Sequence, residues 1–162
     1  MTERLDVVGI GNAMVDAIIP SNKNEIEKHQ INRDSMNLID EDLKNNLHNS
    51  YSIKEMVGGG SLGNSMFGIT SFGGNGSFIG KIKNDDIGTY LQKDMVREGL
   101  KFPLGFTSPD ISTGCCTIFV EEDGTRTMCT FLGAGTLIGP EDIHPEHIIS
   151  HKIAYLEGYL WD

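Results

Sequence analysis

Short apolar runs alternate with helical segments along most of the sequence. Leu5 to Gly11 (LDVVGIG) is typical of a buried strand that leads into a loop. Leu62, Met66 and Ile69 follow at helical spacing, and Lys152 to Leu156 (KIAYL) is a further apolar strand. Because strands that alternate with helices form mainly parallel sheets covered on both faces, the sequence predicts a three-layer α/β fold.

One segment breaks this alternation. Two β-rich runs, Thr113 to Glu121 and Thr125 to Leu132, follow each other with no helix between them. The residues that join them, Glu122-Asp123-Gly124, contain the Asp-Gly pair that favours a tight hairpin turn. We therefore expect residues 113–132 to form an antiparallel appendage outside the main sheet, and a candidate lid.

Charge and composition exclude several classes of partner. The chain has 23 acidic and 13 basic residues, which gives a formal net charge of −10. Nucleic acids and anionic membrane surfaces bind basic faces, so we expect neither as a partner. Asp6 interrupts the only apolar run near the N-terminus, and no stretch approaches the ~20 apolar residues of a membrane span. We expect a cytoplasmic protein.

The three cysteines, Cys115, Cys116 and Cys129, do not form a disulfide pattern. Their number is odd, and adjacent residues of a strand point to opposite faces, so Cys115 and Cys116 cannot easily bridge. We expect reduced, packed thiols.

A glycine cluster, residues 58–64 (GGGSLGN), precedes the helix that contains Met66. Glycines allow a ligand to approach the backbone closely, but they also allow a tight turn that binds nothing, and composition alone leaves both readings open. Gly58, Gly60 and Gly63 also match the dinucleotide-binding pattern G-x-G-x-x-G, with Asp85 at a suitable distance. Residues 51–57 are a poor buried first strand, so a dinucleotide-binding domain remains a minor alternative.

Five motifs in order resemble one known family. They are GNAMVDAI at 11–18, MNLID at 36–40, the long segment 58–88 that begins GGGSLGNSMFG, DGTRTMCTFLGAG at 123–135 and the closing YLEGYLWD. Together they resemble the PfkB, or ribokinase-like, carbohydrate kinases, and within them the adenosine kinase-like branch. The resemblance implies a ribokinase-like three-layer α/β sandwich with a small β-sheet lid, built from segments around 16–20, 36–39 and 113–132.

The same resemblance implies a set of substrate-binding residues. Asp16 matches the aspartate that accepts hydrogen bonds from sugar hydroxyls, and Asn12 matches a residue that lines the same pocket. Gly59 and Gly60 match a glycine pair against which the sugar lies, and Asn64 matches an asparagine that binds a ribose hydroxyl. Leu62 stands where the family usually has alanine, and we expect it to crowd the start of the helix.

The family's catalytic motif does not occur in this chain. Family kinases use ATP and Mg, with a general-base aspartate in a GAGD motif; the nearest match here, residues 133–136, ends in Thr136. The N-x-x-E metal motif matches residues 22–25 and 24–27, but both matches lie in a predicted charged surface helix. We regard both as coincidental. We therefore expect residues 1–162 to be the N-terminal, substrate-binding half of such a kinase, without catalytic residues, ATP-binding half or bound cofactor.

Two other polar groups invite a metal-binding interpretation. Asp85 and Asp86 could hold a cation together, but Asp at this position is typical of a helix cap. His144, His147 and His151 could share a helix face, yet no carboxylate or cysteine is placed to complete the site, and we expect a solvated face. We expect no metal site.

Two functional hypotheses follow, besides the dinucleotide-binding domain. The first is the substrate-binding part of an ATP-dependent nucleoside or sugar kinase, inactive alone, whose ligand is adenosine or a ribose-type sugar. The second is a binding or assembly module that joins a separate C-terminal half, or pairs with itself through the lid.

Overall fold

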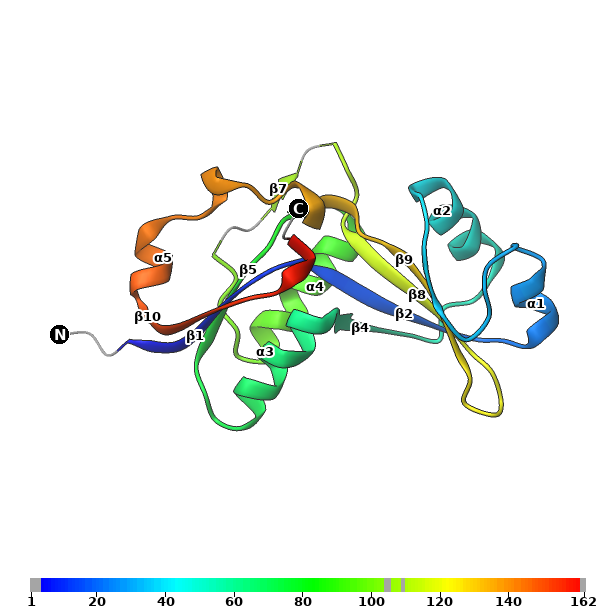
Figure 1. Cartoon of the computed structure of the whole chain (residues 1–162), viewed down its shortest axis with the longest axis horizontal. Coiled ribbons are helices and arrows are strands. Elements are labelled where there is room, and N and C mark those ends of the chain that lie inside the picture. Colours follow the sequence, from blue (N-terminus) through cyan, green and yellow to red (C-terminus); the bar gives the residue numbers. More distant parts are fainter. Residues whose placement is uncertain (1–3, 104–105, 109, 161–162) are drawn as a thin grey trace.

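A computed structural model describes residues 4–103, 106–108 and 110–160 (Figure 1). The strands are β1 (Leu5–Ile10), β2 (Met14–Pro20), β3 (Met36–Leu38), β4 (Glu55–Gly59), β5 (Gly76–Ile79), β6 (Ile82–Lys83), β7 (Phe106–Ser108), β8 (Gly114–Val120), β9 (Arg126–Phe131) and β10 (His151–Leu156). The helices are α1 (Lys23–Glu27), α2 (Glu41–Ser50), α3 (Ser61–Ser71), α4 (Asp86–Arg97) and α5 (Pro145–Ile149), with 3-10 turns at Gly133–Leu137, Pro140–Asp142 and Gly158–Leu160.

The first sheet is parallel and has the order β10-β1-β5. Its central strand, β1, buries side chains on both faces. On one face Val7 packs with Leu62 and Met66 of α3, and α4 extends the same cluster. On the other face Val8 packs with apolar side chains that include Ile148 of α5. Helices therefore cover both faces of this sheet, and the predicted three-layer arrangement is confirmed.

The second sheet has the order β3-β9-β8-β2-β4. The predicted hairpin, β8 and β9, is antiparallel and lies in this sheet, outside the first one. The sheet as a whole is mixed, however, because β2 runs parallel to β8 and β3 runs parallel to β9. Figure 1 shows β2, β8 and β9 running away from the first sheet toward α1 and α2 at the far end of the molecule.

Helices α1 and α2 cover one face of the second sheet. Ile26 of α1 and Leu47 of α2 are fully buried in a cluster with Ile19, Phe119 and Cys129 from the strands. The opposite face carries a separate apolar cluster built on Met14, Cys116 and Ile118 of β2 and β8. The two faces thus have different neighbours, and the second face borders the cavity described below.

The structure differs from the sequence predictions at several elements. The β-rich segment Ser77–Ile82 contributes to two strands, β5 and β6, which are interrupted at Gly80, where a Cβ atom would lie 2.8 Å from the Gly11 carbonyl oxygen. Residues 51–57 contribute to β4, an edge strand that pairs antiparallel with β2 rather than a buried strand of the parallel sheet.

Asp85 acts as a helix cap, as predicted. Its Oδ1 accepts a hydrogen bond from the Gly88 amide at 2.7 Å, and its Oδ2 accepts one from the Thr113 amide at 2.9 Å. The carboxylate therefore ties the start of α4 to the segment that enters β8, and both oxygens are used within the protein.

The histidine prediction is wrong for His151. We expected a solvated face, but His151 is only 6% exposed, and its Nε2 lies 2.9 Å from Ser77 Oγ. The reason is its place at the first residue of β10, under α5 and close to β5. The rings of His144 and His147 meet edge to face, with centroids 5.4 Å apart.

The three cysteines are free and buried, as predicted. Cys116 belongs to the apolar cluster of the open face, whereas the Cys115 sulfur lies 3.9 Å from His48 Nε2 of α2 on the other face. Adjacent strand residues thus point to opposite sides of the sheet.

Strand β10 lies at one edge of the first sheet. Lys152 through Leu156 are all exposed, and among them Ile153 is 59% and Leu156 60% accessible to solvent. An apolar strand exposed in this way is an unusual surface for a folded protein.

In the described ranges no helix is both long enough and apolar enough to cross a membrane.

Candidate functional site

A cavity of about 440 Å³ lies between the open face of the second sheet, the start of α3 and the segments that follow β1 and β10. Asn12, Gly60, Ser61, Asn64, Glu157 and Tyr159 come from the latter elements, and the second sheet adds the polar side chains Asp16, Arg126 and Thr130. Its apolar wall comes from the second sheet: Met14, Met36, Leu38, Ile118, Met128 and Leu132. The cavity is thus polar on one side and mainly apolar on the other.

Four of the five residues predicted to bind substrate line this cavity. Asn12 follows β1, Asp16 lies in the middle of β2, and Gly60 and Asn64 belong to the start of α3. Gly59, the fifth, ends β4 and lies behind Asp16. The structure therefore brings residues from three separate parts of the sequence to one place.

The glycine pair has a structural explanation at this site. A Cβ atom on Gly59 would overlap the carboxylate of Asp16, so glycine leaves the room that this side chain occupies. Gly60 has φ +78°, a left-handed conformation that side chains other than glycine rarely adopt. Gly59 therefore makes a close approach to Asp16, and Gly60 alone contributes backbone to the cavity wall.

The carboxylate of Asp16 is half-buried and accepts a hydrogen bond from the Gly60 amide. Burial raises the pKa of Asp16, while the Gly60 amide and the positive charge of Arg126 partly offset that rise. A carboxylate that has lost part of its water shell gains from any donor that enters the cavity. Asp16 is therefore a strong hydrogen-bond acceptor in the cavity.

Asn12 presents a second acceptor. Its Oδ1 is buried and has no hydrogen-bond donor among the described residues. The backbone of Gly135 packs beside it, since a Cβ atom there would lie 2.9 Å from Oδ1. Residues 133–136 thus belong to a 3-10 turn that lies behind Asn12.

Leu62 does not crowd the site, and our expectation that it would is wrong. The side chain is fully buried and points toward β1, away from the cavity. Room for it comes from Gly9 and Gly11, where Cβ atoms would lie 2.9 Å and 2.7 Å from its two methyl carbons. The larger side chain therefore fills the core between α3 and β1.

Sequence reasoning missed several residues of the cavity, above all Glu157. Ile10 and Leu156 are register partners in the parallel sheet, so the residues that follow β1 and β10 emerge side by side. Ligands of open α/β sheets bind beyond the carboxyl ends of the strands. That rule, applied to the predicted strand at 152–156, would have pointed to Glu157 and Tyr159.

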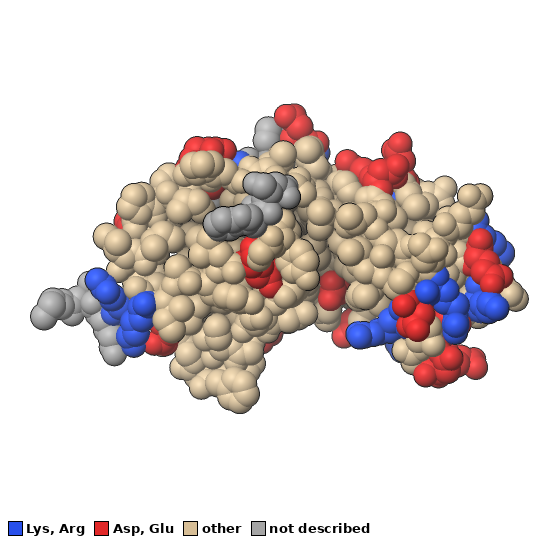
Figure 2. Space-filling view, in the orientation of Figure 1, with Lys and Arg blue, Asp and Glu red and all other residues tan. Residues whose placement is uncertain are grey.

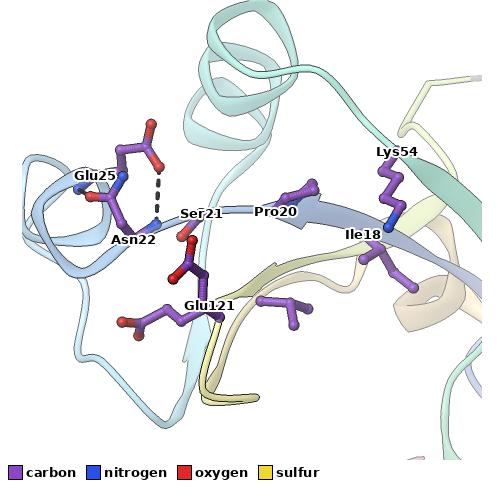
Figure 3. A pocket seen from close by; sticks show the side chains of 9 residues that line it. Ile18, Pro20, Ser21, Asn22, Glu25, Lys54 and Glu121 are labelled. Atoms are coloured by element: carbon purple, nitrogen blue, oxygen red, sulfur yellow. Dashed lines mark hydrogen bonds between the residues drawn. The ribbon is translucent and has the colours of Figure 1, made fainter.

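A second cavity, of about 540 Å³, lies at the far end of the second sheet (Figure 3). Some of its polar groups are engaged in local contacts, whereas Ser21 Oγ is buried and has no hydrogen-bond partner among the described residues. The Asn22 amide donates to the Glu25 carboxylate at 3.1 Å, and Glu121 forms an ion pair with Arg33 at 2.7 Å. We regard the first cavity as the candidate functional site, because four of the five predicted substrate-binding residues line it and none of them lines the second.

Charge on the visible face of the molecule is uneven. Figure 2 shows most of its basic side chains at two ends, near the N-terminus and at the far end of the second sheet, with mainly uncharged side chains between.

Across the described part of the chain, no group of three or more His, Cys, Asp and Glu side chains could hold a metal ion.

Comparisons with known proteins agree on one family. A family model described as pfkB family carbohydrate kinase matches residues 5–160. An adenosine kinase from Sinorhizobium meliloti is 36% identical, with a TM-score of 0.87 over 98% of this chain and 49% of that one. A probable sugar kinase from Rhizobium etli is 34% identical, with a TM-score of 0.87 over 99% of this chain and 49% of that one.

A curated relative is more distant. The bifunctional ribokinase/ribose-5-phosphate isomerase A of Fructilactobacillus sanfranciscensis is 24% identical over 155 residues, which are 93% of this chain and 26% of that protein. The chain thus spans about half the length of the solved structures it matches and about a quarter of this relative.

Proposed function

Because the chain belongs to the pfkB family of carbohydrate kinases, we propose that it supplies the substrate-binding part of an ATP-dependent nucleoside or sugar kinase. The observation that carries the proposal is the half-buried carboxylate of Asp16, which faces a cavity large enough for a small molecule. The substrate is adenosine or a ribose-type sugar, and the protein acts in the cytoplasm, where ATP is supplied.

The polar side of the cavity suits a sugar. A carboxylate only accepts hydrogen bonds, so Asp16 can take both hydroxyls of a vicinal diol, and each bond is strengthened by its charge. Asn64 lines the same cavity with an amide that both donates and accepts, and the buried Oδ1 of Asn12 offers a further acceptor. Gly60 lets the ring lie against the backbone, since it has no side chain.

The second sheet acts as the lid of this site in our proposal. The expected segments around 16–20, 36–39 and 113–132 contribute four of its strands, and β4 adds a fifth. Its open face is apolar and borders the cavity, so closure over a bound ligand would exclude water from the sugar. Exclusion of water strengthens the hydrogen bonds to Asp16.

The residues of this chain do not fit ATP and Mg. Kinases of the family use ATP, but the sequence lacks a GAGD motif, and its nearest match lies in the 3-10 turn behind Asn12. The described residues also offer no cluster of carboxylates for a metal ion. Phosphoryl transfer depends on a positioned base, a metal and donors around the γ-phosphate. We therefore assign this step to residues outside the 162.

The purified chain should not phosphorylate adenosine or ribose. The expected result is ATP consumption at the background rate in the presence of either acceptor, because the base and the phosphate-binding groups are missing. Adenosine should still bind in a parallel calorimetric titration, which shows that the sample is folded and competent. Turnover well above background from a pure, monodisperse sample would contradict the proposal that phosphoryl transfer needs residues outside this chain.

A second candidate function, an assembly module, is favoured by the exposed strand β10. Its residues 152–156 are accessible on both faces, and the similar structures are about twice as long as this chain. A separate C-terminal half that continues the sheet would cover them. Light scattering separates the possibilities, since self-association raises the mass of the chain alone, whereas a module that needs a different partner stays monomeric.

A further inference from the structure

Side chains of α4 cover the outer edge of β4, the strand that ends the second sheet. In an antiparallel edge strand, alternate residues turn their N–H and C=O groups away from the neighbouring strand. Two such residues on β4 are Met56 and Gly58. The Tyr90 hydroxyl donates to the Met56 carbonyl oxygen, and the Gly58 amide donates to Asp94 Oδ2 at 2.8 Å. Tyr90 and Asp94 lie one helical turn apart, so a single face of α4 satisfies this edge.

Asp94 is buried at this contact and is only 5% exposed. Its other oxygen, Oδ1, accepts a hydrogen bond from Arg97, whose side chain is largely exposed. The approach to the strand is close, because a Cβ atom on Gly58 would lie 2.7 Å from Asp94 Oδ2. Asp94 does not line the candidate cavity. Any effect on that site must therefore pass through the backbone that its carboxylate holds.

Gly58 is the first of three consecutive glycines, and the candidate site depends on the other two. Gly59 leaves room for the Asp16 carboxylate, and the Gly60 amide donates a hydrogen bond to it. Glycine has more backbone freedom than any other residue, so a run of three needs restraints from outside to keep one conformation. Strand β2 restrains the run from one side, and Asp94 restrains it from the other.

We propose that Asp94 is a positioning residue of the candidate site, which holds the Gly58–Gly60 backbone so that Asp16 keeps its place and its hydrogen bond from Gly60. The inference rests on the proposed function and adds a residue that acts from outside the cavity. A site binds more tightly when its groups are held in the bound geometry before the ligand arrives. Loss of Asp94 transfers the ordering of three glycines to the binding step.

The first test is a calorimetric titration of Asp94 variants with adenosine. Asp94→Ala removes the acceptor, and we expect at least about tenfold weaker binding, because the glycine run must then be ordered when the ligand binds. Asp94→Asn keeps an acceptor and the shape of the side chain, while the exposed Arg97 can turn to solvent. This variant should bind within about threefold of the wild type.

Tyr90→Phe is the matched control. It removes the neighbouring edge bond, to Met56, and leaves the bond between Asp94 and Gly58 in place. Its affinity for adenosine should stay within about threefold of the wild type, since the glycine run is still held. An equal loss of binding in Tyr90→Phe and Asp94→Ala would assign the effect to the strand edge as a whole and overturn the inference.

A second readout needs no ligand. Burial raises the pKa of Asp16, and the hydrogen bond from Gly60 lowers it in part. A backbone that no longer presents this amide should therefore give Asp16 a higher pKa. We expect ¹³C NMR of the Asp16 carboxyl group to show that rise in Asp94→Ala. Asp94→Asn controls for the lost charge and should titrate like the wild type, whereas a merely structural role of Asp94 would lower the melting temperature without moving this titration.

Unchanged affinity or an unchanged Asp16 titration in Asp94→Ala would overturn the inference. If Asp94→Ala does not fold, Asp94→Leu replaces it, because leucine has a similar branched shape and no acceptor, and the same two results are expected. The proposed function fails separately. A folded wild-type chain that binds no adenosine would contradict that function, while the ligand-free titration of Asp16 still decides whether Asp94 positions this carboxylate.

Discussion

Asp16→Asn should weaken adenosine binding at least about tenfold and leave the thermal stability of the chain equal or higher. The amide keeps the shape of the side chain but loses the negative charge and one acceptor. Hydrogen bonds to a charged group contribute about 1.5–3 kcal/mol each, which corresponds to roughly a tenfold to hundredfold change in affinity. Calorimetry measures the affinity, and a thermal melt measures the stability.

The stability part follows from the sign of the pKa shift. Burial raises the pKa of Asp16, so the folded chain binds this proton more tightly than the unfolded chain does. The folded state is therefore favoured as pH falls, and at pH 7 the ionised carboxylate costs stability that Asn removes.

The same shift predicts how binding depends on pH. The wild-type affinity should fall as pH drops through the raised pKa of Asp16, and the Asn variant should not show this fall. Equal affinity of the two proteins would exclude Asp16 from the site. A melting temperature lowered by more than about 4 °C, on the order of 1 kcal/mol for a chain of this size, would show a structural role instead.

Gly59→Ala is the second large effect, and we expect at least about tenfold weaker adenosine binding. The added methyl group would overlap the Asp16 carboxylate, which must then rotate away from the Gly60 amide and from the sugar. The chain should still fold, because the group that moves is the end of a side chain. Calorimetry and circular dichroism check the two parts.

Gly68→Ala is the matched control. Gly68 lies inside α3, and a Cβ atom there meets nothing within 4 Å. Alanine in a helix is more favourable than glycine by about 0.5–1 kcal/mol, so this variant should melt slightly higher and bind adenosine normally. If Gly59→Ala binds as well as Gly68→Ala, the close approach of Gly59 and Asp16 has no part in recognition.

Local patterns in the sequence predicted most of the elements. The buried run at β1, the Asp-Gly turn between β8 and β9 and the Asp85 cap of α4 all depend on neighbouring residues, and all three are confirmed. Strand β4 was missed because its residues Glu55–Gly59 are partly exposed at a sheet edge and show no buried apolar run. Such a strand is defined by its pairing with β2, which no local pattern encodes.

The candidate site was predictable only in part. Asn12, Asp16, Gly60 and Asn64 came from motif resemblance, and the structure places all four around one cavity. The contact between Gly59 and Asp16 joins positions 43 residues apart, so spacing could not reveal it. Likewise, the inward packing of Leu62 depends on Gly9 of β1 and on Gly11 just after that strand, about 50 residues earlier in the sequence.

The most direct test of the substrate-binding role is a titration of the ¹⁵N-labelled chain with adenosine, followed residue by residue by NMR. The account predicts that the amide signals of Asp16, Gly60, Asn64 and Cys116 shift most, since these residues surround the candidate cavity. Signals that shift instead around Ser21 and the other residues of the second cavity, or no shift at saturating adenosine, would contradict it.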